Sequence, residues 1–566
     1  MIKIIKRSLL ILSSFAFIYP SINAQTSVKE GLPKGWHLMD SEKDGFHGIS
    51  LNQAYEFVKA KNNKSKTIIV AVIDSGIDTT HEDLKPVLWR NKGEIPGNGI
   101  DDDKNGYIDD VNGWNFIGGK DGRNVKEDSY EMARVYHKFK DQFLQVQDPS
   151  TLSEEDRKLY KMWLKAAEQI SGDPKEQLNF MLIKNAYKEA LAGDSIMQKN
   201  LGKNSYTGSD VEAFAPTDEE GTKAKRKVLT LYHGLGIDLD RSNTEILSEI
   251  GDYVSGQERK LEAGEKAPRD YRGEIVKDNY NDINDRFYGN SDVMANTPFH
   301  GTHVSGIIGA ARNNKKGIDG VAGNVKIMTI RAVPDGDEHD KDIALGIRYA
   351  VDNGAQIINM SFGKGFSPEK KWVDEAVKYA EEHDVLLVHA AGNDASNIDE
   401  VENYPAPVFM EDGYRAPNWI TVGASGDPAE GGFTANFSNY GKSEVDIFAP
   451  GVKIYSTIPG GNTYGNAQGT SMASPVVAGV AAFILSNYPE LSAKQVKYVI
   501  EKTASDPGTQ VNKPGSDDAM VDFSEISRNA GIINAYEAVK LASTLKGERK
   551  TAPTKTRSTV SPIKNN

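Results

Sequence analysis

The sequence predicts an α/β fold in which a doubly wound, mainly parallel sheet carries a large helical insertion. Strand-like apolar runs alternate with helical patterns along most of the chain, as in sheets that have helices on both faces. Residues 67–73 form a continuous β-branched run, which is typical of a central strand buried on both faces. Residues from about 120 to 295 are instead charged and show helical periodicity. We therefore expect one large domain with an insertion.

The first 24 residues have the pattern of a secretion signal. Lys3, Lys6 and Arg7 precede an apolar run over 9–19, and the small residue Ala24 precedes the expected cut. The apolar run is short for a membrane span, so we expect no span after signal removal; a short anchor is the alternative. The pattern predicts export, either to a periplasm or out of the cell. The chain has no cysteine, which excludes disulfides and a lipid-modified cysteine.

The elements of the main domain follow from their periodicity. A short amphipathic helix over 49–58 precedes the first strand. Further strands are predicted at 325–332, 355–360, 385–390, 419–424 and 445–449. Helices are predicted at 340–353, 368–383, 470–487, 492–503 and 534–545. The helix from 470 has no polar face, so it must be buried on nearly all sides, and Pro475 is expected in its first turn.

These elements define the domain boundaries. Residues 25–119 and 296–545 are assigned to the main domain, 120–295 to the insertion and 546–566 to a disordered tail. The insertion should hold helices at 128–143, 153–171, 176–192, 222–233 and 244–263. It could be a lid, a partner surface, a folding aid or a tolerated insertion, because surface insertions cost little thermodynamically.

Composition and charge limit the class of protein. Hydrophobic residues make up 38% and charged residues 26% of the chain, which is a soluble globular composition. The net charge is −13, and the predicted signal contributes three positive charges and no acid, so the rest carries about −16. This balance argues against a nucleic-acid partner.

Three residues together indicate acyl transfer. Asp74 follows the first strand, His303 lies at the start of a predicted helix, and Ser471 opens the buried helix. A serine hydroxyl becomes nucleophilic when a base takes its proton, and the base needs a carboxylate that orients it and stabilises its cation. Free N–H groups at a helix start can also hold an oxyanion. Taken singly, Asp74 could be a turn residue and Ser471 a helix cap.

The loop that starts at Asp101 matches the first half of a calcium loop. Oxygen ligands fall at positions 1, 3, 5, 7 and 9, with glycine at position 6; they are Asp101, Asp103, Asn105, the carbonyl of Tyr107, and Asp109. Position 12 is Asn112 instead of the bidentate glutamate. The sequence thus predicts a structural calcium site, with a solvated acidic turn as the alternative.

At these motifs the chain resembles the subtilisin-like serine proteases, the subtilases. Three blocks carry the resemblance, namely AVIDSGID at 71–78, HGTHVSGIIGA at 300–310 and GTSMASPVVAG at 469–479, and Ala-Ala-Gly-Asn at 390–393 is a fourth. The resemblance implies that Asn393 donates to the oxyanion together with the Ser471 N–H. It also implies substrate-binding residues, which are Ser361, Phe362 and Gly363 along an extended peptide and Ala391, Gly392 and Asn403 around a specificity pocket.

The resemblance therefore implies an exported serine endopeptidase that acts on polypeptides. Ser471 would attack the peptide carbonyl, His303 would be base and then acid, and Asp74 would orient His303. Activity is expected to fall as His303 becomes protonated. A catalytically inactive scaffold that binds a partner through the insertion is the alternative. Within the enzyme reading, a nutritional degrader and a processing protease both stay open.

Overall fold

A computed structural model describes residues 31–549 except 173, 297 and 517. The described chain forms two compact units. Ala167–Lys266 make up the smaller unit, and Leu32–Ala166 with the chain from Ala267 onward make up the larger one. The predicted signal and residues 550–566 lie outside the described residues.

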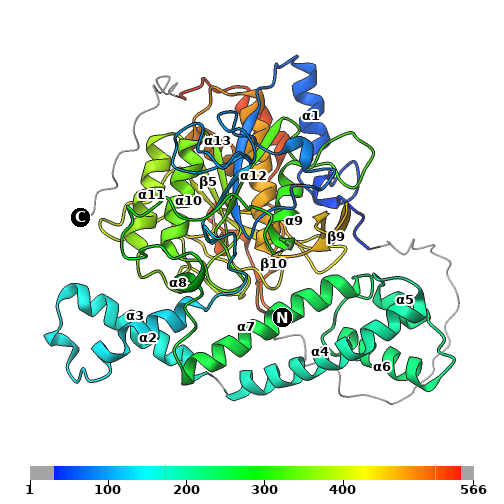
Figure 1. The fold of residues 1–566 in the computed structure, drawn as a ribbon. Coiled ribbons are helices and arrows are strands. Elements are labelled where there is room, and N and C mark those ends of the chain that lie inside the picture. Colours follow the sequence, from blue (N-terminus) through cyan, green and yellow to red (C-terminus); the bar gives the residue numbers. More distant parts are fainter. Residues whose placement is uncertain (1–30, 173, 297, 517, 550–566) are drawn as a thin grey trace, which may run out of the picture. The chain divides into compact units, whose positions relative to one another are not determined.

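The larger unit is built on a seven-stranded sheet in which every neighbouring pair of strands is parallel (Figure 1). Its order is β2-β3-β1-β4-β5-β6-β7. The strands are β1 (Ile68–Asp74), β2 (Gly113–Asn115), β3 (Val325–Arg331), β4 (Ile357–Met360), β5 (Leu386–Ala390), β6 (Trp419–Ser425) and β7 (Ile447–Pro450). The six strands predicted in this sheet are present, and the short β2 is additional.

Helices cover both faces of the sheet, which confirms the doubly wound α/β class. Val70 and Val72 of β1 pack in the core that includes α1 (Leu51–Ala60), α9 (Phe299–Gly309), α12 (Thr470–Asn487), α13 (Ala493–Lys502) and α14 (Ala535–Ala542). Ala71 and Ile73 point the other way, into the core with α10 (Asp340–Asp352) and α11 (Lys370–Glu382). This alternation explains the unbroken apolar run.

The helix α12 is the most buried helix of the sheet's first face. Sixteen of its residues are buried, and it contacts β1, β4, β5, β6 and β7. Among the described residues it alone has the length and apolarity to cross a membrane, yet 89% of it is buried inside the fold. Pro475 lies in the second turn of α12 and not in the predicted first turn, because it is the sixth residue of a helix that begins at Thr470.

The inserted segment is divided between the two units. The helices α2 (Glu131–Phe143), most of α3 (Glu154–Ser171) and α8 (Tyr271–Ile275) belong to the larger unit. The smaller unit contains α4 (Pro174–Leu201), α5 (Gly208–Ala213), α6 (Glu219–Gly234) and α7 (Asn243–Glu265), which enclose a core of their own. The independent unit is thus shorter than the predicted 120–295.

Two short hairpins and the start of the tail differ from the sequence prediction. The strands β8 (Ile454–Ile458) and β9 (Thr463–Ala467) pair antiparallel, as do β10 (Val511–Asn512) and β11 (Met520–Val521). Residues 546–549, predicted as disordered, are fastened to the fold: Arg549 donates from its backbone to Glu490 O (2.9 Å) and from Nε to Leu491 O (3.0 Å).

Candidate active site

Asp74 ends the central strand β1 at the edge where the carboxyl ends of the strands meet. Its side chain is buried, and its Oδ1 accepts a hydrogen bond from Ser75 N (2.7 Å). Ligands of such sheets bind beyond this edge. The position therefore holds a carboxylate rigidly where it can act on a neighbouring group.

The group that Asp74 holds is His300. His300 Nδ1 lies 2.8 Å from Oδ1 and 3.0 Å from Oδ2 of Asp74. Burial opposes protonation of the imidazole, but the charge and hydrogen bonds of Asp74 outweigh it and raise the pKa of His300 above 6.5. The close approach requires glycine at 301, because a Cβ there would lie 2.1 Å from Gly76 O. The His300 side chain is 38% exposed, so substrate can reach it.

The structure contradicts the sequence-based choice of His303 as the partner of Asp74. His303 is completely buried, and its Nε2 is 3.1 Å from Gly465 O in β9. Burial lowers its pKa to about 4, and the nearby His300 contributes to the lowering. The helix α9 starts at the sheet edge and runs away from it, so the earlier histidine lies nearer to Asp74 by about 4.5 Å along the axis.

Ser471 lies in the first turn of α12 and is anchored to the end of β4. Its Oγ donates to Ser361 O (3.1 Å), and its carbonyl accepts from Ser361 Oγ (3.0 Å). In an uninterrupted helix that carbonyl would accept from the N–H of residue 475, but Pro475 has no N–H. The Ser361 hydroxyl replaces the missing donor and fixes the serine backbone.

The side chain of Asn393 is oriented by Thr470. Asn393 Oδ1 accepts from Thr470 N (2.9 Å) and Thr470 Oγ1 (3.1 Å). The amide oxygen is therefore occupied, and Nδ2 lies beside the helix start, 3.4 Å from the position of a Cβ on Gly469. Among the described residues, the Ser471 N–H has no acceptor. Two donors close to Ser471 are thus available to a developing negative charge.

The predicted substrate-binding residues lie on two adjoining segments. After β4, Phe362 O accepts from His389 Nε2 (2.8 Å), whereas neither backbone polar group of Gly363 has a partner in the described chain. The second segment follows β5 and contains Ala391 and Gly392, and Asn403 joins it to the first. Asn403 Nδ2 donates to Ala391 O (3.2 Å), and its Oδ1 lies 3.2 Å from the position of a Cβ on Gly363. Gly392 N donates to Thr470 Oγ1 (3.0 Å), which ties this segment to the start of α12.

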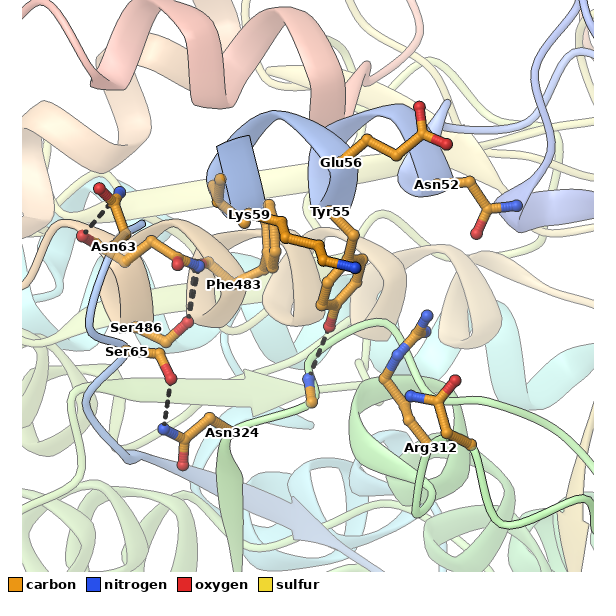
Figure 2. Close-up of a pocket in the computed structure, with 14 residues that line it drawn as sticks. Asn52, Tyr55, Glu56, Lys59, Asn63, Ser65, Arg312, Asn324, Phe483 and Ser486 are labelled. Atoms are coloured by element: carbon orange, nitrogen blue, oxygen red, sulfur yellow. Dashed lines mark hydrogen bonds between the residues drawn. The ribbon is translucent and has the colours of Figure 1, made fainter. Parts of the chain in front are cut away.

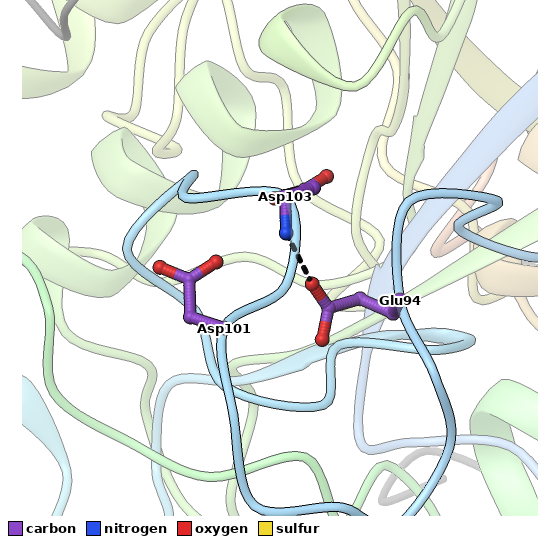
Figure 3. A group of neighbouring side chains, drawn as sticks. All are labelled: Glu94, Asp101 and Asp103. Atoms are coloured by element: carbon purple, nitrogen blue, oxygen red, sulfur yellow. Dashed lines mark hydrogen bonds between the residues drawn. The ribbon is translucent and has the colours of Figure 1, made fainter.

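The predicted metal loop brings together only part of the predicted ligand set. Carboxylate oxygens of Glu94, Asp101 and Asp103 lie within 4.8 Å of one another (Figure 3). Asp109 instead accepts from the backbone of Gly97 and Gly99 (2.8 Å each). The prediction missed Glu94 because it precedes the loop; its carboxylate accepts from the backbone of Asp103 and Asp109.

The other two predicted ligands are also accounted for. Asn105 Oδ1 accepts from Tyr107 N (2.8 Å), and the carbonyl of Tyr107, the predicted ligand, accepts no hydrogen bond from the described chain. No lysine or arginine of the described chain forms an ion pair with Glu94, Asp101 or Asp103. Three adjoining carboxylates without a counter-ion provide the all-oxygen donor set that calcium prefers, so these residues fit the ion.

A surface cavity of about 580 Å³ lies away from these groups (Figure 2). It is lined by α1 and by Phe483 to Asn487 at the end of α12 opposite Ser471. Several of its polar side chains pair within the protein, for example Asn324 Nδ2 with Ser65 Oγ (3.0 Å).

Comparison with known proteins identifies the family. The profile of the subtilase family (Peptidase S8) matches residues 65–524. Subtilisin DY of Bacillus licheniformis is 42% identical over 213 residues, covering 37% of this chain and 71% of that protein. Subtilisin J of Geobacillus stearothermophilus is 33% identical over 364 residues, covering 61% and 88%. A solved protease structure from Pseudoalteromonas arctica is 30% identical over 43% of this chain and 70% of that one, with a TM-score of 0.34.

The chain therefore belongs to the subtilase family. It is a subtilisin-like serine endopeptidase, and its substrates are polypeptides. The resemblance drawn from the four sequence blocks is confirmed.

Proposed function

We propose that this subtilase cleaves peptide bonds with Ser471 as nucleophile, His300 as base and Asp74 as the group that orients His300. The hydrogen bond between Asp74 and His300 carries the assignment, since it leaves Nε2 of the imidazole for the serine. When substrate binds, the Ser471 hydroxyl turns from Ser361 O to His300 Nε2. This geometry replaces His303 in the role that the sequence assigned to it.

The reaction follows from the positions of these groups. Ser471 Oγ attacks the peptide carbonyl while its proton passes to His300 Nε2, and the charge of Asp74 stabilises the resulting imidazolium. The Asn393 amide and the Ser471 N–H stabilise the oxyanion. His300 then gives its proton to the leaving amine. Water, deprotonated by His300, hydrolyses the acyl-enzyme and regenerates the serine.

Substrate binding is proposed along the segment that follows β4. The unpaired backbone groups of Gly363 can pair with an extended peptide, with Ser361 nearest the reacting serine. Ala391, Gly392 and Asn403 border the pocket for the side chain before the cut. Because pairing through the main chain is insensitive to sequence, recognition is broad and the pocket adds preference.

Two further features complete the proposal. Glu94, Asp101 and Asp103 hold a structural calcium ion that neutralises their adjoining charges. The protein is exported, which the charged and apolar pattern of residues 1–24 supports. A relative, the cell wall-associated protease of Bacillus subtilis, is 34% identical over 274 residues, covering 46% of this chain and 28% of that one.

The test is hydrolysis of an internally quenched peptide by the wild type and by Ser471→Ala. The wild type should cleave the peptide and the variant should lose turnover, because no other group can form the acyl-enzyme. Equal rates for the two proteins would refute the assignment of Ser471.

A further inference from the structure

A buried lysine directly follows the residues proposed to bind substrate. Lys364 comes after Gly363, and its side chain is only 2% exposed. Its Nζ lies 2.7 Å from Glu131 Oε2, 2.8 Å from Asp340 Oδ1 and 2.8 Å from Glu338 O. The ammonium group donates hydrogen bonds to Glu131 and to Glu338 O and forms an ion pair with Asp340, as the burial of a charge requires.

The two carboxylates come from different elements. Glu131 is the first residue of α2, in the inserted segment, and Asp340 is the first residue of α10. Each also has another partner: Glu131 pairs with Arg134 (2.7 Å), and Asp340 accepts from Ser367 Oγ (3.0 Å). Without the lysine, Glu131 keeps Arg134 as its cation, whereas Asp340 keeps only the hydrogen bonds from Ser367 Oγ and Glu369 N, so deletion of the lysine also costs stability.

The backbone of Lys364 and the residues after it are fastened as well. Lys364 N and O each form a 2.9 Å hydrogen bond with Tyr404, the neighbour of Asn403 at the proposed specificity pocket. From α3, Lys165 Nζ reaches Gly365 O (3.0 Å) and Glu402 Oε2 (2.8 Å). The same ammonium lies 4.8 Å from the centre of the Phe366 ring.

These contacts place α2 and α3, two helices of the inserted segment, against residues 364–366, which directly follow the residues proposed to bind substrate. Ser361 is nearest to Ser471, and the segment then runs away from the reacting serine through Gly363 to Lys364, Gly365 and Phe366. A short substrate meets only the first of these residues. A longer peptide that follows this segment also meets residues 364–366, which α2 and α3 hold.

We propose that Lys364 is a positioning residue for long polypeptide substrates, because its ion pairs fix the segment 361–366, along which substrate is proposed to bind, to the inserted helix α2. The beginning of the insertion is then part of the substrate-binding apparatus, and removal of this contact weakens binding more for long peptides than for short ones. The proposal rests on the proposed function, in which Ser361, Phe362 and Gly363 bind the peptide.

The test compares two substrates that share the residue before the cleaved bond, an internally quenched octapeptide and a two-residue chromogenic amide. Lys364→Met replaces the ammonium by an apolar group of similar length, and Glu131→Gln removes one charge of the pair. Lys497→Met is the matched control, since Lys497 is also largely buried and bonds to Asp446 and Trp419 O. Trp419 begins β6 and so lies at the amino ends of the strands, whereas Ser471 lies at their carboxyl ends.

Lys364→Met should raise the ratio of KM for the octapeptide to KM for the amide by about tenfold, which corresponds to ~1.4 kcal/mol of binding. Glu131→Gln should raise the ratio less, and the two changes should not be additive, because they remove the same contact. Lys497→Met should lower Tm and leave the ratio unchanged.

An unchanged ratio in both Lys364→Met and Glu131→Gln overturns the inference, as does an equal rise in Lys497→Met. Should Lys364→Met fail to fold, Glu131→Gln still decides. The proposed function fails separately: in that case the wild type cleaves neither substrate or Ser471→Ala stays active. An active wild type with unchanged ratios in the variants removes only the role of Lys364.

Discussion

The two histidines of α9 should respond in opposite ways to the same substitution. His300→Gln removes the imidazole that Asp74 holds, and kcat/KM should fall by about 10⁴-fold or more, since general-base catalysis and serine activation are both lost. His303→Gln changes a completely buried residue that contacts β9. Its kcat/KM should fall by less than about tenfold, equivalent to under ~1.4 kcal/mol of barrier.

Stability should distinguish the same pair. The pKa of His303 falls from 6.5 to about 4 in the fold, a difference of about 3 kcal/mol between its two protonation states. A histidine whose pKa is lower in the folded state stabilises the fold above its unfolded pKa of 6.5, and this contribution disappears as the pH falls towards 4. The His303→Gln variant should therefore lose less stability than the wild type between pH 7.5 and pH 4.5.

The assays are peptide hydrolysis at pH 8 and chemical denaturation at the two pH values. His300 adds a second check. Because Asp74 raises the pKa of His300, kcat/KM of the wild type should begin to decline at a pH above 6.5 when the pH is lowered. An active His300→Gln variant together with an inactive but folded His303→Gln variant would refute the assignment of the base.

Three other predictions follow from the site and its surroundings. Asn393→Ala should lower kcat by about 10²–10³-fold, the range known from subtilisin for one oxyanion donor; a change confined to KM in steady-state assays would argue against this role. His37→Phe should raise the free energy of unfolding at pH 5, because His37 is buried with both ring nitrogens unpaired and its pKa is lowered to about 3. Denaturation curves measure the loss of stability between pH 7.5 and pH 5, and an equal loss in the variant and the wild type would contradict this prediction. Calcium at 100 times its Kd should stabilise the protein by about 2.7 kcal/mol, so a chelator should lower Tm in the wild type and not in Asp101→Ala; a wild-type Tm that ignores the chelator would remove the ion from the account.

The sheet was predictable because its strands are buried on both faces. Val70 to Ile73 must be apolar in every position, which produces a continuous run that no surface helix shares. The short β2 and the β8–β9 hairpin gave no such signal, since β2 has only three residues and β9 is half-buried or exposed and mixes polar with small residues. Local sequence also could not show that residues 131–166 pack with the larger unit, because that depends on distant partners such as Lys364 and Glu402.

The candidate site was predictable in its chemistry but not in every residue. Asp74 ends β1 and Ser471 lies in the first turn of α12, where position limits what a residue can do, and Asn393 lies in the loop that follows β5. His300 and His303 lie on the same helix, and the choice between them depends on the direction in which α9 leaves the sheet edge. A helix that starts at the catalytic edge favours its earlier histidine, and this signal was present in the predicted order of elements.

The metal loop shows a similar limit. The spacing of Asp101 and Asp103 located the loop, but the alternating pattern assigned Asp109 to the ion, whereas its carboxylate binds the backbone of Gly97 and Gly99. Glu94 precedes the loop and joins the cluster through the fold of residues 94–103. Side chains that hydrogen-bond to nearby backbone cannot be separated by spacing alone from those that converge on an ion.

Covalent labelling tests the central claim most directly. A fluorophosphonate reacts only with a serine whose hydroxyl has been activated, and peptide mapping by mass spectrometry locates the label. The wild type and His303→Gln should each carry one label on Ser471, and His300→Gln should carry none. A label on another residue, or undiminished labelling of Ser471 in His300→Gln, would contradict the account.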